Sequence, residues 1–142
     1  MDDNSIITLD VASTDTSSGL ALSIWLDDQC VFQTQHVREP IRYNQVVNDD
    51  PGKHELKIVM SGKTQNDTFI DDHGNIVKDA LLNIAFSVDN INFDEVFQKN
   101  AVYTHNFNGA QNEIVDTFHG LMGCNGVLSL KFTTPLFIWV LG

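Results

Sequence analysis

Short stretches in which apolar and polar residues alternate run along most of the chain, separated by groups of turn-forming residues. Successive side chains of a β-strand point to opposite faces, so alternation over residues 20–26 predicts a half-buried strand. The pair Asp27-Asp28 and the apolar run 30–37 follow it, which together predict a hairpin. The strongest turn signal lies at 48–52, because Pro51 presets φ and Gly52 tolerates positive φ. Residues 54–60 then alternate again.

The same pattern recurs to the end of the chain and predicts an all-β fold. We expect further strands over residues 6–11, 41–46, 69–70, 76–77, 81–86, 91–97, 101–107, 127–132 and 135–141. Many short strands at a spacing of about ten residues are typical of an antiparallel β-sandwich or jelly roll. The length of 142 residues fits a single domain over 1–142, in which the C-terminal strands 127–141 close the core or dock on a neighbour. Only residues 113–121 suggest a helical turn, and the fit is poor.

The charge balance excludes one large class of partners. Eight Lys and Arg residues stand against 19 Asp and Glu residues, for a formal net charge of −11. Non-specific nucleic-acid binding requires the neutralisation of phosphates, so we expect no nucleic-acid partner. No stretch approaches the roughly 18 to 20 apolar residues that would span a bilayer, so we expect no membrane partner. The sequence does not decide whether Cys30 and Cys124 form a disulfide, and two thiols alone do not make a zinc site.

Two sequences start like catalytic motifs, and neither is complete. Ser61-Gly62-Lys63-Thr64 ends like a phosphate-binding loop, but Lys57 stands where that motif needs its first glycine. His54-Glu55 begins like a zinc-protease helix, but Ile58 stands where the second histidine ligand belongs. No Gly-x-Ser-x-Gly nucleophile motif is present. A carboxylate pair from distant strands remains open as a glycosidase alternative. We therefore predict that the protein is not an enzyme.

The acidic turns and the aromatic residues offer candidate binding sites. Asp67, Asp71 and Asp72 cluster around one predicted turn, and Ca²⁺ prefers six to eight oxygen ligands of this kind. The alternative is ordinary turn chemistry, because Asp favours turns through local hydrogen bonds. Trp25 and Tyr43 are candidates for stacking on a sugar ring, and for that role they should face solvent close to the acidic turn. The alternative is that both are core or interface residues.

The chain ends on its most apolar segment, residues 133–142. We expect a terminal strand that is either a central member of a sheet or a contact with another subunit, because a monomer seldom leaves such a patch in water. The candidate contact residues are Pro135, Phe137 and Trp139.

The order of segments between Leu22 and Val96 resembles the calcium-dependent xylan-binding modules. The likeness rests on a strand-turn-strand at 23–32, a Gly-x-His turn into a long strand at 52–58, and a strand pair at 81–84 and 91–93. The resemblance implies a β-sandwich that binds polysaccharide through a loop-bound Ca²⁺, with Asp67, Asp71 and Asp72 as the ligands.

A second resemblance covers about half of the chain. The segments 52–64, 74–81, 101–105, 122–126 and 130–135 resemble small structural proteins of tailed bacteriophages, including those that infect cyanobacteria. This resemblance implies a jelly-roll component located in the virion, with other virion proteins and further copies of itself as partners. Our main hypothesis is therefore a non-enzymatic decoration or accessory subunit of a phage head, tail or baseplate. The alternative is a carbohydrate-binding module that recognises a host-surface glycan, with or without Ca²⁺.

Overall fold

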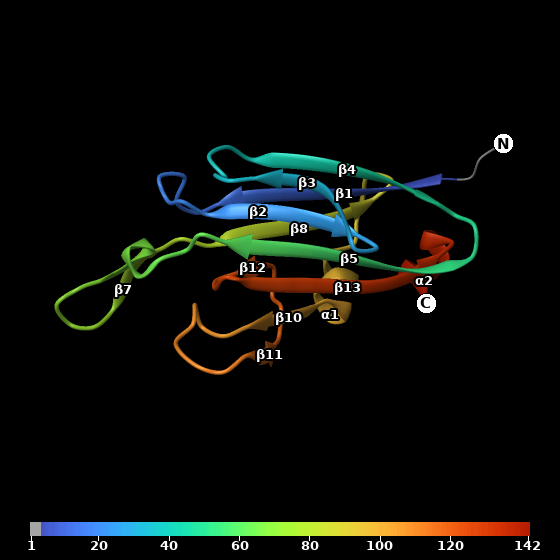
Figure 1. The fold of residues 1–142 in the computed structure, drawn as a ribbon. Helices are drawn as coiled ribbons and strands as arrows, with labels where there is room; N and C mark the ends of the chain where they lie inside the picture. Colours follow the sequence, from blue (N-terminus) through green and yellow to red (C-terminus); the bar gives the residue numbers. More distant parts are fainter. Residues whose placement is uncertain (1–3) are drawn as a thin grey trace.

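Two antiparallel sheets pack face to face in the computed structural model, which describes residues 4–142 (Figure 1). The first sheet has the order β12 (Leu121–Met122), β8 (Leu82–Val88), β1 (Asn4–Ser13) and β4 (Ile41–Asn48), with β9 (Ile91–Asn92) paired to β8. The second has the order β11 (Ile114–Asp116), β10 (Val102–His105), β13 (Gly126–Thr134), β5 (Gly52–Ser61), β2 (Ala21–Leu26) and β3 (Gln29–Thr34). The prediction of an antiparallel β-sandwich is confirmed.

Smaller elements complete the fold. A separate hairpin of β6 (Thr68–Ile70) and β7 (Ile76–Asp79) follows the short 3₁₀ helix η1 (Gln65–Asp67) and extends away from the sandwich (Figure 1). Of the two short helices, α2 (Leu136–Leu141) lies at the opposite end, and α1 (Asp94–Asn100) lies beside β13. Among the described residues no helix has the length and hydropathy needed to cross a membrane.

Alternation explains why the central strands of the second sheet form the core. Leu56 and Ile58 of β5 are buried and pair with Leu130 and Leu128 of β13, so the same face of both strands points inward. The β2–β3 turn has positive φ at both Asp27 and Asp28, as a two-residue hairpin turn that matches the strand twist requires.

The predicted strand over 91–97 is wrong beyond its first two residues. The chain leaves β9 and forms the helix α1, in which Phe97 is buried and stacks on Phe86 with ring centroids 4.9 Å apart. Asp94 and Glu95 lie in the first turn, where acidic side chains favour the helix dipole. Asp94 also accepts a hydrogen bond from the Phe86 backbone N–H at 2.6 Å, which fixes the helix to β8. The predicted helical turn over 113–121 is also wrong, because the strands β11 and β12 lie there.

The C-terminal apolar run does not continue as a strand over 135–141. β13 ends at Thr134, Pro135 takes the N-cap position, and the run folds into the helix α2. Leu136 and Val140, four residues apart on one helix face, are buried against the core. Phe137 and Trp139 are half-buried and pack on the same core, whereas Ile138 and Leu141 are 70% and 77% exposed. The predicted role of Pro135, Phe137 and Trp139 in a subunit contact stays a prediction.

Candidate functional site

The loops that follow β1, β5, β7, β10 and β12 gather at the end of the sandwich from which the β6–β7 hairpin extends (Figure 1). We call this region the loop end. Hydrogen bonds join these loops directly: the Leu81 N–H donates to the Thr14 hydroxyl, the Lys63 ammonium to the Gly123 carbonyl, and the Asn125 N–H to Asn108 Oδ1. The ion pair of Lys63 with Asp79 joins the first of these contacts to the other two, so the loop end is one connected structure.

A buried lysine lies at its centre. The Lys63 side chain is only 3% exposed, and its Nζ lies 2.7 Å from Asp79 Oδ1. The same ammonium donates to the Gly123 carbonyl at 2.6 Å. The Lys63 backbone N–H donates to Asn125 Oδ1 at 2.9 Å, and Asn125 Nδ2 donates back to the Lys63 carbonyl at 3.0 Å. A buried charge persists only when it is paired and hydrogen-bonded, and Lys63 meets both conditions.

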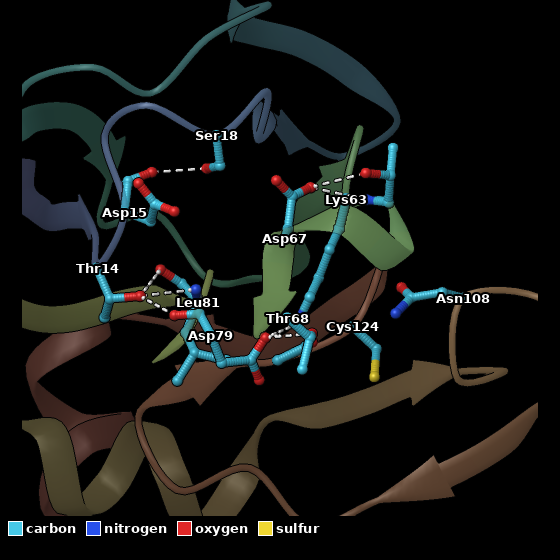
Figure 2. Close-up of polar contacts among 12 residues, drawn as sticks. Thr14, Asp15, Ser18, Lys63, Asp67, Thr68, Asp79, Leu81, Asn108 and Cys124 are labelled. Atoms are coloured by element: carbon cyan, nitrogen blue, oxygen red, sulfur yellow. Dashed lines mark hydrogen bonds and ion pairs between the residues drawn. The ribbon is translucent and has the colours of Figure 1, made fainter. Parts of the chain in front are cut away.

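Asp79 connects this lysine to the base of the hairpin (Figure 2). Its Oδ1 also accepts a hydrogen bond from the Thr68 hydroxyl at 2.7 Å, which ties β7 to β6. Its backbone carbonyl accepts from the Thr14 hydroxyl at 2.8 Å, and that hydroxyl in turn accepts from the Leu81 N–H at 2.9 Å. The hairpin is thus anchored to the end of β1 through polar contacts.

The loop between β12 and β13 is held from the other side by Tyr103. Its hydroxyl donates to the Cys124 carbonyl and accepts from the Cys124 N–H at 2.8 Å. Burial raises the pKa of Tyr103 to about 12, so the phenol stays neutral and both bonds persist over the physiological pH range. The next residue, Asn125, donates its N–H to Asn108 Oδ1 at 2.8 Å and so reaches the β10–β11 loop.

A cleft opens between the segment after β5 and the β10–β11 loop. It has a volume of about 510 Å³, and we call it the Phe107 cleft. Its residues are Lys63, Thr64, Gln65 and Thr68 on one wall and Phe107, Asn108, Gly109 and Ala110 on the other. Its lining therefore combines one aromatic ring with hydroxyl and amide groups, and its single charged residue is already held in the ion pair with Asp79.

Phe107 reaches this cleft from a strained backbone. Phe107 and Asn108 have φ values of 53° and 59°, in the left-handed region that a bulky side chain rarely adopts. The Phe107 side chain is 39% exposed although its type favours burial. Hydrogen bonds fix the turn, since the Phe107 N–H donates to His105 Nδ1 at 3.2 Å and the Gly109 N–H donates to Asn106 Oδ1 at 2.8 Å. Strain of this kind clusters at ligand sites.

His105 sets the position of this turn. Because its Nδ1 accepts from the Phe107 N–H, we infer that Nε2 carries the proton and donates to Asp116 Oδ2, 2.9 Å away. That hydrogen bond is the main cause that lowers the pKa of Asp116. The edge-on contact of the His105 and Phe107 rings, with centroids 4.6 Å apart at 78°, adds a packing contribution.

The predicted aromatic pair is not brought together. Trp25 lies half-buried on β2, and its indole N–H donates to Ser23 Oγ at 2.9 Å. Tyr43 lies on β4 of the other sheet, where its ring packs 5.7 Å from Phe32 and its hydroxyl donates to Gln45 Oε1 at 2.6 Å. Burial raises the pKa of Tyr43. The two residues belong to different sheets, and their predicted role in stacking on a sugar ring stays a prediction.

The three predicted calcium ligands each make different contacts. Asp67 Oδ2 accepts the Thr64 N–H at 2.8 Å and caps η1. Asp71 Oδ1 accepts the His73 and Asn75 N–H groups, both at 2.9 Å, and these bonds lower its pKa. Asp72 is exposed near the tip of the hairpin. Within residues 4–142, no three His, Cys, Asp or Glu side chains are arranged to hold a metal ion. The Ca²⁺ site stays a prediction.

Sequence reasoning did not single out the residues that form the cleft. Phe107 was expected only as the last residue of a strand before the Asn108-Gly109 turn, and Lys63 was considered only as part of a phosphate-binding motif. The sequence held a signal for both residues. Phe107 stands directly before an Asn-Gly turn, which places its side chain at a loop tip. Lys63 follows Gly62 directly after a predicted strand, which places it where the sheet ends.

Comparison with known proteins adds a fold relationship. No family model matches the chain, and no curated protein matches it. The fold is similar to the selenomethionine form of vCBM60, from work linking two families of calcium-dependent carbohydrate-binding modules through circular permutation. The TM-score is 0.52, with 13% sequence identity and coverage of 90% of each chain. vCBM60 in complex with galactobiose gives a TM-score of 0.49 at 12% identity, covering 88% of this chain and 96% of that one. Neither structure is a virion protein, so these comparisons do not support the resemblance to phage proteins.

Proposed function

We propose that this protein is a non-catalytic carbohydrate-binding module and that its ligand binds in the Phe107 cleft. One observation carries the proposal: the exposed Phe107 ring is held on a strained backbone among neutral hydroxyl and amide side chains. The similarity in fold to a calcium-dependent carbohydrate-binding module supports it.

The chemistry of the cleft suits a neutral sugar. A pyranose ring has an apolar C–H face, which packs on an aromatic ring, and a rim of hydroxyl groups, which need donors and acceptors. Thr64, Gln65 and Thr68 supply these on one wall. On the other wall the oxygen of the Asn108 amide is already bonded to Asn125, which leaves its NH₂ group to donate to a ligand. The volume of about 510 Å³ lies within the range of about 300–1,000 Å³ typical of small-molecule sites.

The lining of the cleft supports binding rather than catalysis. Its one ionisable side chain, Lys63, is bonded to Asp79 and to the Gly123 carbonyl, so it has no free role as an acid or a base. The hydroxyls of Thr64 and Thr68 bond to carboxylate oxygens of Asp67 and Asp79, which position them as hydrogen-bonding groups. Binding without turnover is the activity that we assign.

The direct test is calorimetric titration with a panel of neutral oligosaccharides, comparing the native protein with Phe107→Asn. Asparagine tolerates the left-handed backbone, so the variant loses the ring and keeps the turn. Loss of one aromatic stacking contact, worth about 1–1.5 kcal/mol, weakens binding by roughly 5- to 12-fold. The matched control is Phe69→Asn, which removes another exposed phenylalanine (50% exposed) on the β6–β7 hairpin. Equal affinity in the Phe107 variant and the native protein would refute the assignment of the cleft.

The same titration tests the Ca²⁺ prediction. Binding is measured in excess chelator and again with millimolar Ca²⁺. A gain in affinity with Ca²⁺ that Asp71→Asn removes would support a calcium site in the acidic turn. Equal affinity under both conditions would count against it.

A second candidate function is a subunit that assembles through protein–protein contacts, and the β6–β7 hairpin offers a surface for such contacts. Four large apolar residues of this hairpin are 50–68% exposed, namely Phe69, Ile70, Ile76 and Val77. Exposed apolar patches mark contact surfaces in many proteins. Light scattering of the native protein and of an Ile70→Ser, Val77→Ser variant tests this function. A stable oligomer that the variant loses would support it, and a native monomer at all concentrations would count against it.

A further inference from the structure

We infer that the Lys63 ammonium is the cation of the loop end, and that it holds the two walls of the Phe107 cleft in place, so that ligand binding there requires no metal ion. This role rests on the proposed function, because it concerns the same cleft. It differs from the prediction made from the sequence, which places a Ca²⁺ ion at Asp67, Asp71 and Asp72.

Lys63 is unlike the other cationic side chains that form ion pairs. Its side chain is 3% exposed, whereas the lysine and arginine side chains of the other ion pairs within residues 4–142 are 34–70% exposed. A lysine is almost never buried unless partners take up its charge and its hydrogen bonds. The chain therefore places one full positive charge inside the loop end.

The partners of this ammonium are oxygen atoms from two different segments. Asp79 Oδ1, on β7 at the base of the hairpin, lies 2.7 Å from Nζ (Figure 2). The Gly123 carbonyl, in the loop between β12 and β13, accepts from Nζ at 2.6 Å. Carboxylate and main-chain carbonyl oxygens are the ligands that a hard metal cation takes. Because Lys63 bonds to both, its ammonium does at this position what a bound metal ion would otherwise do.

The first of these oxygens fixes one wall of the cleft. Asp79 Oδ1 also accepts the Thr68 hydroxyl at 2.7 Å, and Thr68 lines the cleft. Thr64 and Gln65, on the same wall, follow Lys63 directly in the chain. The lysine therefore holds this wall at two points, through its own backbone and through Asp79.

The second oxygen leads to the opposite wall. Gly123 stands two residues before Asn125, whose side-chain amide forms two hydrogen bonds with the Lys63 backbone, at 2.9 and 3.0 Å. The Asn125 N–H in turn donates to Asn108 Oδ1 at 2.8 Å, and Asn108 stands beside Phe107 on the opposite wall. The side chain and the backbone of Lys63 thus hold the same short segment, residues 123–125, which joins the two walls.

Stability alone does not require a charge at this position. An apolar side chain of similar volume often stabilises a fold as well as a buried ion pair does, because it avoids the cost of desolvating two charges. An apolar side chain cannot, however, donate directed hydrogen bonds to Asp79 and Gly123. The ammonium therefore positions the cleft, and Lys63 is a positioning residue.

The test is chemical rescue of Lys63→Ala, which removes the atoms of one propylammonium ion from the loop end. The native protein, this variant and the control Lys99→Ala, on an exposed lysine of α1, are titrated with the neutral oligosaccharides in excess chelator. We expect the native protein and the control to bind equally with and without chelator, and Lys63→Ala to bind roughly tenfold more weakly. Millimolar propylammonium should restore most of this loss. Tetramethylammonium, which has the same charge and no N–H donor, should not.

A double variant separates positioning from stability. Adding Asp79→Asn to Lys63→Met removes the uncompensated carboxylate and should raise the Tm, but the ammonium donors are still missing, so the affinity should stay low. Recovery of affinity together with Tm would overturn the proposal, because Lys63 would then only stabilise the fold. Native affinity in Lys63→Ala without amine, or a native affinity that falls in excess chelator, would overturn it as well.

Failure of the proposed function is recognised separately. If the native protein binds none of the oligosaccharides, that function is wrong, and amide NMR spectra decide whether Lys63 holds both walls. In Lys63→Ala the signals of Thr68 and Asn108, one on each wall, are expected to move from their native positions and to return with propylammonium. An Asn108 signal that does not move would refute the role of Lys63.

Discussion

Replacement of Lys63 by methionine tests how much the buried ion pair contributes to the loop end. Methionine keeps most of the length and volume of the lysine side chain, so the change removes the charge and leaves little cavity. It abolishes the 2.7 Å contact with Asp79 and the 2.6 Å hydrogen bond to the Gly123 carbonyl. The Asp79 carboxylate then stands without its cation.

The magnitude follows from the burial of the two partners. Removal of one member of a buried pair costs about 3–5 kcal/mol, because the remaining charge is left uncompensated. Lys63 is 3% exposed but Asp79 is 25% exposed, so water reaches the carboxylate, and the Thr68 hydroxyl continues to donate to it. We therefore expect a loss of about 2–3 kcal/mol in the free energy of unfolding. For a chain of this size that loss corresponds to a fall in Tm of roughly 5–10 °C.

Calorimetry and urea denaturation measure the effect, and Arg42→Met is the matched control. The Arg42 and Asp10 side chains of that ion pair are 70% and 40% exposed. Screening by solvent therefore keeps the expected loss there small. Addition of Asp79→Asn to the Lys63 variant removes the uncompensated charge and should restore part of the stability. A loss below about 1 kcal/mol in Lys63→Met, or an equal loss in the control, would refute the reasoning.

Three further predictions address other parts of the molecule. The pKa of Asp116 is lowered from its ordinary value of 3.8, so its stabilisation is present above that pH and is lost as the pH falls through the lower folded-state value. In a plot of the urea midpoint against pH, the native protein should lose stability at acid pH more steeply than Asp116→Asn. Equal slopes at acid pH in the two proteins would contradict this. Cys30 is exposed, whereas burial raises the pKa of the Cys124 thiol. Labelling of the native protein with a thiol reagent should therefore show a fast phase from Cys30 and a slow phase from Cys124. Cys30→Ser should remove the fast phase only, and an unchanged fast phase would contradict this. Leu136→Ala removes a fully buried side chain and should cost about 2–5 kcal/mol in urea denaturation, whereas a loss below 1 kcal/mol would mean that α2 does not contribute to the core.

The sheet could be predicted from sequence because its strands obey a simple alternation. β5 and β13 each place every second residue in the core, and the turn at Asp27-Asp28 needs no information from the rest of the chain. The two helices were not predicted from the sequence, for a physical reason. α1 and α2 have only seven and six residues, which is too short for a helical period to stand out from a strand pattern. α2 in particular is apolar on most sides, and only contact with the core selects the face formed by Leu136 and Val140.

The candidate site was less accessible to sequence reasoning because its residues come together only in the fold. Lys63 and Asp79 are separated by a whole hairpin, and Asn108 meets Asn125 only after β10 and β13 have paired. Acidic residues that looked like a cluster in sequence are used singly in turns, as the bonds of Asp71 to His73 and Asn75 illustrate. Proximity in sequence therefore grouped these acidic residues and gave no indication of the cleft.

The cost of the Phe107 turn is the strongest reason to regard the loop end as functional. A left-handed phenylalanine costs about 1–2 kcal/mol relative to a glycine or asparagine at the same position, and its exposed ring recovers only part of its burial energy. The closure of β10 onto β11 does not require that residue, because Asn108 and Gly109 next to it already have the positive φ values that the turn uses. The His105 contact and the Asn106 cap hold the strained conformation in place without removing the strain. A residue that weakens the fold and is nevertheless fixed in an open cleft is explained most simply by a ligand that packs on its ring.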